Sequence, residues 1–256
     1  MNYRDVTELS GEEISSEQLQ RLCNRYYWAG NYCQDKDVLE VACGSGPGLG
    51  YLAQIAKKLV AGDISDEILN IARHHYKERI DIRKFDASAM PFLNQSFDVV
   101  IIFEALYYLP NVEEFMKECK RVLRSAGILL IVTANKDLYD FHRSPYSYTY
   151  YGVVELENLL KKYNFEVNFY GETSVKKVSI KQKIFRPIKK IASNLNLIPE
   201  TMKGKKWLKR FVFGKLTPMP AEIEHSTANY EAPTPLISGK PDRVHKVIFC
   251  LAQTKN

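Results

Sequence analysis

The stretch "VLEVACGSGPG" at residues 38–48 constrains the fold of this chain more than any other feature. An apolar run enters a turn that has glycine at every second position, at Gly44, Gly46 and Gly48. A strand followed by such a turn and a helix is how open parallel sheets bring their backbone close to a ligand. The dinucleotide-binding pattern requires glycine at position 49, where this chain has Leu49. The turn therefore predicts a ligand site that departs from the pyrophosphate pattern.

Apolar runs alternate with helical periodicities from residue 37 to 172, which predicts a parallel sheet covered by helices. The clearest helix is expected over 112–124, with Asn111 as its N-cap and Gly127 just beyond its end. Seven strands are predicted, at residues 37–43, 58–63, 80–86, 96–103, 127–134, 165–172 and 243–255.

Positive charge is concentrated in one segment. Residues 176–215 hold 13 lysines and arginines against one acid, Glu200, so this segment carries a net charge of +12 on an otherwise acidic chain. Such asymmetry predicts an anionic partner. Apolar residues alternate with the lysines in this segment, which is typical of a basic amphipathic helix on an anionic membrane surface. The alternative is that the segment caps the ligand site with its apolar side, while its lysines only face solvent.

The chain is predicted to divide into three parts: an N-terminal helical cap at 1–35, a sheet domain at 36–172 plus 243–256, and a basic insertion at 173–242 on the acceptor side. Its apolar runs are too short to span a bilayer, and the first residues lack the apolar core of a signal peptide. We therefore expect a cytoplasmic protein. Contact with the membrane surface through residues 176–215 is compatible with this location. The five cysteines include no CxxC pair and are expected to be reduced.

Two acids follow predicted strands at the edge where a ligand would bind. Asp63 ends the second strand 19 residues after Gly44, where its carboxylate can accept hydrogen bonds from both hydroxyls of a ribose. A helix-capping role is the alternative for Asp63. Asp86 ends the third strand, where it can accept a hydrogen bond from the amino group of an adenine. The ligand is therefore predicted to contain a nucleoside.

With these residues in view, the chain resembles the class I S-adenosylmethionine-dependent methyltransferases that act on small molecules, the methyltransferase type 11-like group. The resemblance covers about residues 36–172 and the last strand. It implies an α/β, Rossmann-like, doubly wound sheet of seven strands, mostly parallel, with the last strand antiparallel between the fifth and sixth. It also implies that 36–172 plus 243–256 bind S-adenosyl-L-methionine.

The resemblance extends to individual residues. Tyr26 lies in "NRYYWAG", a region that in relatives folds over the methionine end of the cofactor, although packing within the helix explains it equally well. Many relatives carry a histidine after the fourth strand, where this chain has Tyr107 and Tyr108. Any role of that histidine in the relatives is therefore not expected in this chain. The implied cofactor-binding residues are Tyr26, Glu40, Gly44, Gly46, Gly48, Asp63, Ile64, Asp86, Ala87 and Phe103.

Methyl transfer to a hydroxyl would be helped by a general base, because one proton leaves the acceptor. His142, in the loop after the fifth strand, is the first candidate. The alternative is that His142 has no catalytic role and only bonds a backbone carbonyl within its loop. Glu104, just past the fourth strand, is the second candidate. The histidines and cysteines lack metal-ligand spacing, so no metal is expected.

The turn after the fourth strand, "FEALYY", lacks the Pro-Pro motif of enzymes that methylate amino groups of planar bases, which favours a small acceptor. A run of tyrosines near this turn suits a sugar ring. We expect transfer to a sugar hydroxyl or amine of a nucleotide-sugar or glycolipid in surface polysaccharide biosynthesis. The alternatives are an RNA methyltransferase that uses 176–215, although contact with nucleic acid is not the favoured expectation, and a non-catalytic cofactor-binding protein.

Overall fold

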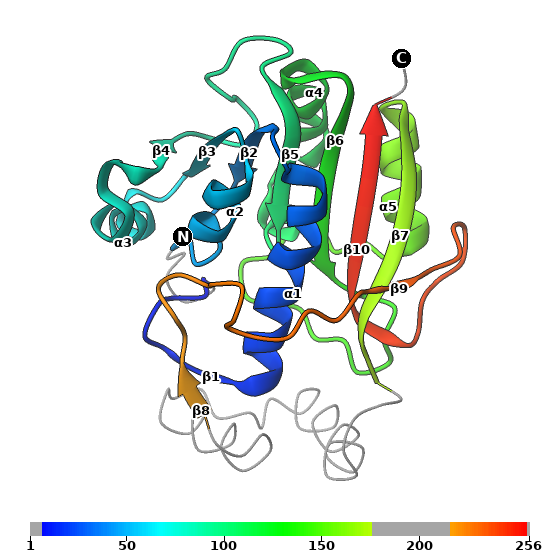
Figure 1. Cartoon of the computed structure of the whole chain (residues 1–256). Helices are drawn as coiled ribbons and strands as arrows, with labels where there is room; N and C mark the ends of the chain where they lie inside the picture. The colour runs from blue at the N-terminus through cyan, green and yellow to red at the C-terminus, as the bar shows by residue number, and fades with distance from the viewer. Residues whose placement is uncertain (1–6, 176–215, 255–256) are drawn as a thin grey trace.

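A computed structural model describes residues 7–175 and 216–254, which form a central sheet with helices on both faces (Figure 1). The sheet strands are β2 (Asp37–Val41), β3 (Lys58–Asp63), β4 (Asp81–Lys84), β5 (Phe97–Phe103), β6 (Leu123–Ala134), β7 (Phe165–Ser174), β9 (Thr234–Pro235) and β10 (His245–Thr254). Their order in the sheet is β4-β3-β2-β5-β6-β10-β7-β9. Strands β4, β3, β2, β5 and β6 pair in parallel, whereas β10 is antiparallel to both β6 and β7.

The predicted mostly parallel α/β sheet is confirmed, including the insertion of the last strand between the fifth and sixth. The predicted number of seven strands is wrong, because the two-residue strand β9 adds an eighth at the edge beside β7. Strand β6 also begins at Leu123 rather than 127, and its register against β5 shifts between Phe97 and Val99.

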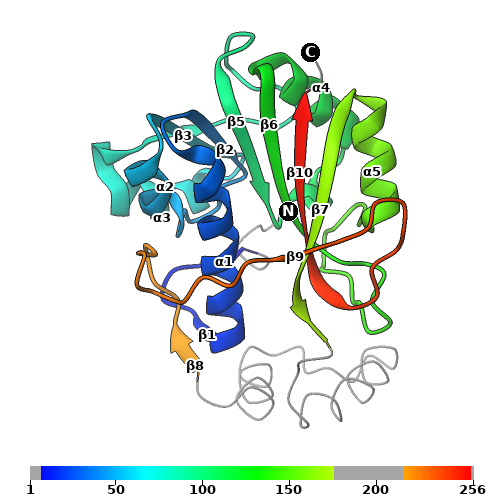
Figure 2. The same ribbon diagram turned by 45° about the vertical axis from the view of Figure 1, so that its right-hand side comes forward.

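The two faces of the sheet bury separate apolar cores, because side chains alternate along each strand. Helices α1 (Ser16–Cys33), α2 (Leu49–Ile55) and α3 (Asp66–Tyr76) cover one face, and α4 (Val112–Val122) and α5 (Val153–Lys162) cover the other (Figures 1 and 2). On β5, for example, Ile101 packs on the α1 side and Ile102 on the α4 side, and both are fully buried. This packing fixes the carboxyl ends of the strands beneath α1.

The predicted helix over 112–124 is present as α4, and it ends two residues earlier than expected. The side chain of Asn111 caps it by accepting a hydrogen bond from the Glu114 backbone N–H at 3.2 Å. Leu123 leaves the helix in extended conformation and opens β6. The short turn η3 (Leu106–Tyr108) precedes α4 and follows the end of β5.

Residues 216–242 cross the outer side of α1 as an extended segment, which we call the strap (Figures 1 and 2). Its strand β8 (Leu216–Pro218) pairs with β1 (Glu13–Ser15), directly before α1. Further along, the Asn229 carbonyl accepts a hydrogen bond from Gln20 at 2.6 Å, and the Asn24 side chain accepts one from the Glu231 N–H at 3.1 Å. The strap thereby holds α1 against the sheet.

The strap is the described part of the predicted insertion, and it contains two short strands and no helix. The basic segment 176–215, with its predicted helix and membrane contact, lies outside the described residues. In residues 7–175 and 216–254 there is no helix long and apolar enough to cross a membrane. All five cysteines are buried and none forms a disulfide.

Candidate active site

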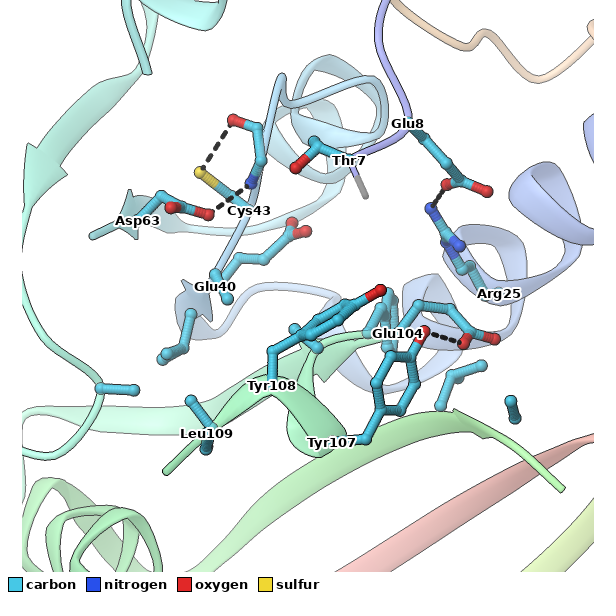
Figure 3. A pocket seen from close by; sticks show the side chains of 18 of the residues that line it. Thr7, Glu8, Arg25, Glu40, Cys43, Asp63, Glu104, Tyr107, Tyr108 and Leu109 are labelled. Carbon is cyan, nitrogen blue, oxygen red and sulfur yellow. Dashed lines mark hydrogen bonds and ion pairs between the residues drawn. The ribbon is translucent and has the colours of Figure 1, made fainter. Parts of the chain in front are cut away.

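A cavity of about 340 Å³ lies where the carboxyl ends of the parallel strands meet α1 and the chain before it (Figure 3). Its size is within the usual range for small-molecule sites. Of the predicted site residues, nine line this cavity: Tyr26, Glu40, Gly44, Asp63, Ile64, Asp86, Ala87, Phe103 and Glu104. Residues from five separate segments of the chain are thus brought together at the sheet edge.

The glycine turn after β2 follows a path that side chains rarely allow. Gly44 and Gly46 have φ of +58° and +74°, in the left-handed region that glycine adopts readily. Gly48 is required by its neighbour instead, because a Cβ there would lie 2.2 Å from the Tyr26 ring. Gly46 and Gly48 do not line the cavity themselves. They shape the turn and let Tyr26 pack directly against it.

Asp63 lies at the end of β3, beside the glycine turn. Its Oδ2 accepts a hydrogen bond from the Gly44 N–H, and its Oδ1 accepts one from the Ser65 N–H, both at 3.0 Å. Burial raises the pKa of the Asp63 carboxyl, while these backbone donors act in the opposite direction. Each carboxylate oxygen can accept a further hydrogen bond, so Asp63 is held in place with acceptor capacity left for a ligand.

Asp86 and Ala87 extend the cavity beyond Asp63, where the chain leaves β4. The Asp86 carboxylate accepts a hydrogen bond from the Ser88 N–H at 2.7 Å, which fixes the turn that presents Ala87. Ile64 lines the same end and is partly exposed. We call this part of the cavity, lined by Asp63, Ile64, Asp86 and Ala87, the nucleoside end.

Glu40 lies in the middle of the cavity on β2 and is almost completely buried. Its Oε1 accepts a hydrogen bond from the Tyr26 hydroxyl at 2.7 Å, whereas its buried Oε2 has no partner among the described residues. Burial raises the pKa of Glu40 to about 7, although the Tyr26 hydrogen bond and the Arg25 charge act to lower it. A buried carboxylate with one unsatisfied oxygen is costly, so this site favours a ligand that donates a hydrogen bond or carries positive charge.

Glu40→Gln is expected to stabilise the ligand-free protein at pH 8. The pKa of Glu40 in the folded protein, about 7, lies above its ordinary value of 4.5, so ionisation of Glu40 destabilises the folded state as the pH rises through this interval. We expect the variant to exceed the wild type by about 2–3 kcal/mol in free energy of unfolding at pH 8 and to match it near pH 4.5.

Denaturant unfolding at the two pH values measures the effect of Glu40→Gln. Glu78→Gln is the matched control, because Glu78 is exposed and does not line the cavity, and it should follow the wild type at both pH values. A Glu40→Gln protein that is less stable than the wild type at pH 8 would contradict the prediction.

The far end of the cavity is built around Glu104, which follows β5 with φ of +51°. Its backbone N–H donates to the Val132 carbonyl at 2.7 Å, and its Oε2 accepts a hydrogen bond from the Tyr107 hydroxyl at 2.9 Å. Burial raises the pKa of Glu104, while Arg25, Arg21 and the Tyr107 hydrogen bond lower it. Glu104 is therefore an anchored carboxyl group whose proton affinity exceeds that of an ordinary glutamate.

Tyrosine rings form the wall beside Glu104, and three tyrosines of the run near the turn after β5 line the cavity. Tyr107 stacks on Tyr150 with ring centroids 4.2 Å apart, and the Tyr108 hydroxyl lies 2.5 Å from Ser144 Oγ. Tyr107, Tyr108 and the half-exposed Tyr148 line the cavity. We call this part, with Glu104, the acceptor end; in Figure 3 Glu40 lies between Asp63 and Glu104.

His142 is placed differently from its prediction as a general base. It is exposed, and it is absent from the residues that line the cavity. The loop that contains it turns Tyr148 and Tyr150 inward, because the Tyr148 N–H donates to the Tyr107 carbonyl at 2.8 Å and Tyr150 stacks on Tyr107. Of the two predicted bases, only Glu104 lies in the cavity.

Several residues of the acceptor end were not predicted as site residues. Arg21 and Arg25 reach it from α1, Glu8 from the chain before α1, and Glu172 from the end of β7. Arg25 forms an ion pair with Glu8 at 2.6 Å, and its buried Nε has no partner among the described residues. The sequence offers a signal only for Arg25, which directly precedes Tyr26 in "NRYYWAG".

The residues present suit the nucleoside cofactor that the resemblance implies. The nucleoside end offers the acceptor oxygens of Asp63 to ribose hydroxyls and those of Asp86 to an adenine amino group. The unsatisfied oxygen of Glu40 and the unsatisfied Nε of Arg25 are complementary to an ammonium and a carboxylate, the two charged groups of a methionine. These four residues would hold S-adenosylmethionine along the cavity.

Comparison with known proteins agrees with this geometry. Residues 39–131 match the family model described as a methyltransferase domain. Over these residues the chain is therefore similar to methyltransferase domains, and the candidate site lies within and beside the matched stretch.

Individual relatives share this domain. A protein of Mycolicibacterium smegmatis described as a probable S-adenosylmethionine-dependent methyltransferase is 32% identical over 152 residues, which cover 58% of this chain and 56% of that protein. A ubiquinone biosynthesis O-methyltransferase of Sinorhizobium medicae is 30% identical, over 40% of this chain and 42% of its own length. The chain therefore spans about half the length of these curated relatives.

The fold is also found among solved structures. The YcgJ protein of Bacillus subtilis superimposes with a TM-score of 0.59 at 15% identity, covering 91% of this chain and 98% of that one. This likeness concerns the fold alone.

Proposed function

We propose that this protein transfers a methyl group from S-adenosylmethionine to a hydroxyl or amine of a small molecule. One observation carries the proposal: a single cavity joins the nucleoside end, with Asp63, to an acceptor end with the ionisable Glu104. When bound, S-adenosylmethionine supplies a methyl group that is already strongly electrophilic. The protein's own task is then to align the acceptor, exclude water and remove one proton.

Glu104 is the group proposed to take that proton. Its raised pKa brings its basicity closer to neutral pH than that of an exposed glutamate. Tyr107 orients the carboxylate by donating to Oε2, which leaves Oε1 for the acceptor. The ion pair of Arg25 with Glu8 ties the chain before α1 over this end of the cavity.

The finer proposal is that the acceptor is a sugar, as part of a nucleotide-sugar or glycolipid in surface polysaccharide biosynthesis. The tyrosine wall supports a ring-shaped acceptor, because aromatic faces pack against the apolar faces of a sugar while the hydroxyl tips hydrogen bond. The ubiquinone biosynthesis relative supports a hydroxyl as the methylated group, since its name records an O-methyltransferase.

Incubation of the protein with methyl-labelled cofactor and fractionated cell extracts tests this function. We expect label in the sugar-nucleotide or glycolipid fraction, and none in a reaction with the Asp63→Ala variant. Label in the RNA fraction instead would establish a nucleic-acid methyltransferase. Tight cofactor binding without transfer to any fraction would establish a non-catalytic binding protein.

A further inference from the structure

Arg21 lines the cavity as a cation that has no hydrogen-bond or ion-pair partner in the described part of the chain. It lies on α1, is half-buried, and makes no hydrogen bond or ion pair with any residue in 7–175 or 216–254. Its charge nevertheless acts on the acceptor end, since it lowers the pKa of Glu104. A guanidinium that is partly removed from water and left unpaired is unfavourable unless a ligand neutralises it.

The acids of the acceptor end form no ion pair with Arg21, and each is held by another partner. Glu8 binds Arg25 at 2.6 Å and Glu104 binds Tyr107 at 2.9 Å. Glu172, which lines the cavity from β7, accepts hydrogen bonds from the buried Asn24 at 3.1 Å and from Thr173 at 2.6 Å. Among the described residues, the N–H groups of the Arg21 guanidinium thus remain as donors for a ligand.

The position of Arg21 separates it from the part of the cavity expected to hold the cofactor. Tyr26 contacts the glycine turn at Gly48, and Arg25 is linked to that turn through Glu8, whose carbonyl accepts from Ser45 Oγ at 2.8 Å. Arg21 precedes Arg25 by four residues on the same helix face, about 6 Å further along the axis. It therefore lies on the acceptor side of Arg25.

We propose that Arg21 binds an oxyanion, a phosphate or carboxylate, on the methyl acceptor. The inference rests on the proposed function and narrows it to negatively charged substrates. The planar guanidinium forms paired hydrogen bonds with two oxygens of a phosphate or carboxylate, which also fixes the orientation of the bound molecule. Arg21 would thereby set the acceptor atom beside Glu104, and an uncharged sugar would lack this contact.

The test uses the labelled fraction as substrate and compares Arg21→Gln with Arg83→Gln. Arg83 is a matched control because it is exposed, bonds Asp81 and does not line the cavity. We expect Arg21→Gln to raise the KM for the acceptor about 10- to 100-fold, the value of a charged hydrogen-bonded contact. The Kd for S-adenosylhomocysteine should change by less than about twofold, in line with a contact made only to the acceptor.

Two further readouts identify the chemistry. The methylated product should bind an anion-exchange resin at pH 7, and loss of this binding after phosphatase treatment distinguishes a phosphate from a carboxylate. Inorganic phosphate should compete with the acceptor in the wild type and in Arg83→Gln, and much less in Arg21→Gln.

A neutral product, or equal phosphate inhibition in Arg21→Gln and the wild type, overturns the inference and leaves the proposed function standing. A loss of S-adenosylhomocysteine affinity as large as the change in KM assigns Arg21 to the cofactor and also overturns it. Absence of transfer to every fraction overturns the proposed function together with the inference.

Discussion

Asp63→Ala is expected to reduce the affinity for S-adenosylmethionine by about 100- to 1000-fold, which corresponds to about 3–4 kcal/mol. The reason is that, in the proposed binding mode, the carboxylate accepts hydrogen bonds from both ribose hydroxyls, and hydrogen bonds to a charged group are worth about 1.5–3 kcal/mol each. Burial, which raises the pKa of Asp63, also keeps water from replacing these bonds. Calorimetric titration with S-adenosylhomocysteine measures the loss without turnover.

Two controls separate this loss from a change in the fold, since Asp63 also accepts hydrogen bonds from Gly44 and Ser65. Asp63→Asn keeps one acceptor oxygen for the turn and should lose less affinity than Asp63→Ala. Asp66→Ala removes an exposed acid three residues further on, paired with Lys84, and should bind like the wild type. If a folded Asp63→Ala protein binds S-adenosylhomocysteine as tightly as the wild type, Asp63 does not hold the ribose.

The sheet was predictable because its signals are local. Strand β3 was predicted with its observed bounds, since the short apolar run 59–61 is preceded by Lys58 and is followed by Gly62 and the acid Asp63. The elements that escaped prediction are those whose existence depends on a partner. Strands β1, β8 and β9 have two or three residues each, too few to show a period of two, and they form only where the strap meets β7 and the start of α1.

The start of β6 shows a different limit. Gly127 suggested that the strand begins there, because glycine commonly follows a helix. In the structure Leu123 already pairs with Phe97, and regular pairing resumes at Ile128 opposite Val99. Between these two pairs the β6 chain is irregular, with a φ of +58° at Ala126. The strand continues through this bulge, and the alternation of apolar and polar residues in the sequence gives no sign of it.

The nucleoside end of the site could be predicted, and most of the acceptor end could not. Asp63 ends β3 and Asp86 follows the end of β4 by two residues, so the parallel sheet itself brings both to one edge. Arg21 and Glu172 lie about 150 residues apart in the chain, and they line one cavity because α1 packs against the sheet, where Asn24 donates to Glu172. His142 lies outside the cavity because its loop, which follows β6 at the ligand-binding edge of the sheet, packs Tyr150 against Tyr107 and leaves the imidazole exposed.

Glu104→Gln is expected to lower kcat by about 10²- to 10⁴-fold, the contribution of a general base, with little change in S-adenosylhomocysteine affinity. Glutamine keeps the size of the side chain and can accept the Tyr107 hydrogen bond, but it cannot take a proton. The rate of the wild type should rise with pH as Glu104 ionises, and because burial raises its pKa this rise lies above the range of an exposed glutamate. The pH–rate profile of Glu104→Gln should lack the rise.

Tyr107→Phe distinguishes a base from a carboxylate that only supports the cavity. The Tyr107 hydroxyl donates to the charged form of Glu104 and so lowers its pKa. Its removal should shift the rise in the pH–rate profile to higher pH while the rate at high pH is largely retained, because the phenyl ring can still stack on Tyr150. Glu113→Gln changes a half-exposed acid on α4 that does not line the cavity, and it should leave the profile unchanged. A wild-type rate that does not change over the pH range in which Glu104 ionises would mean that the proton leaves the acceptor without Glu104. A Glu104→Gln enzyme with full kcat would mean the same.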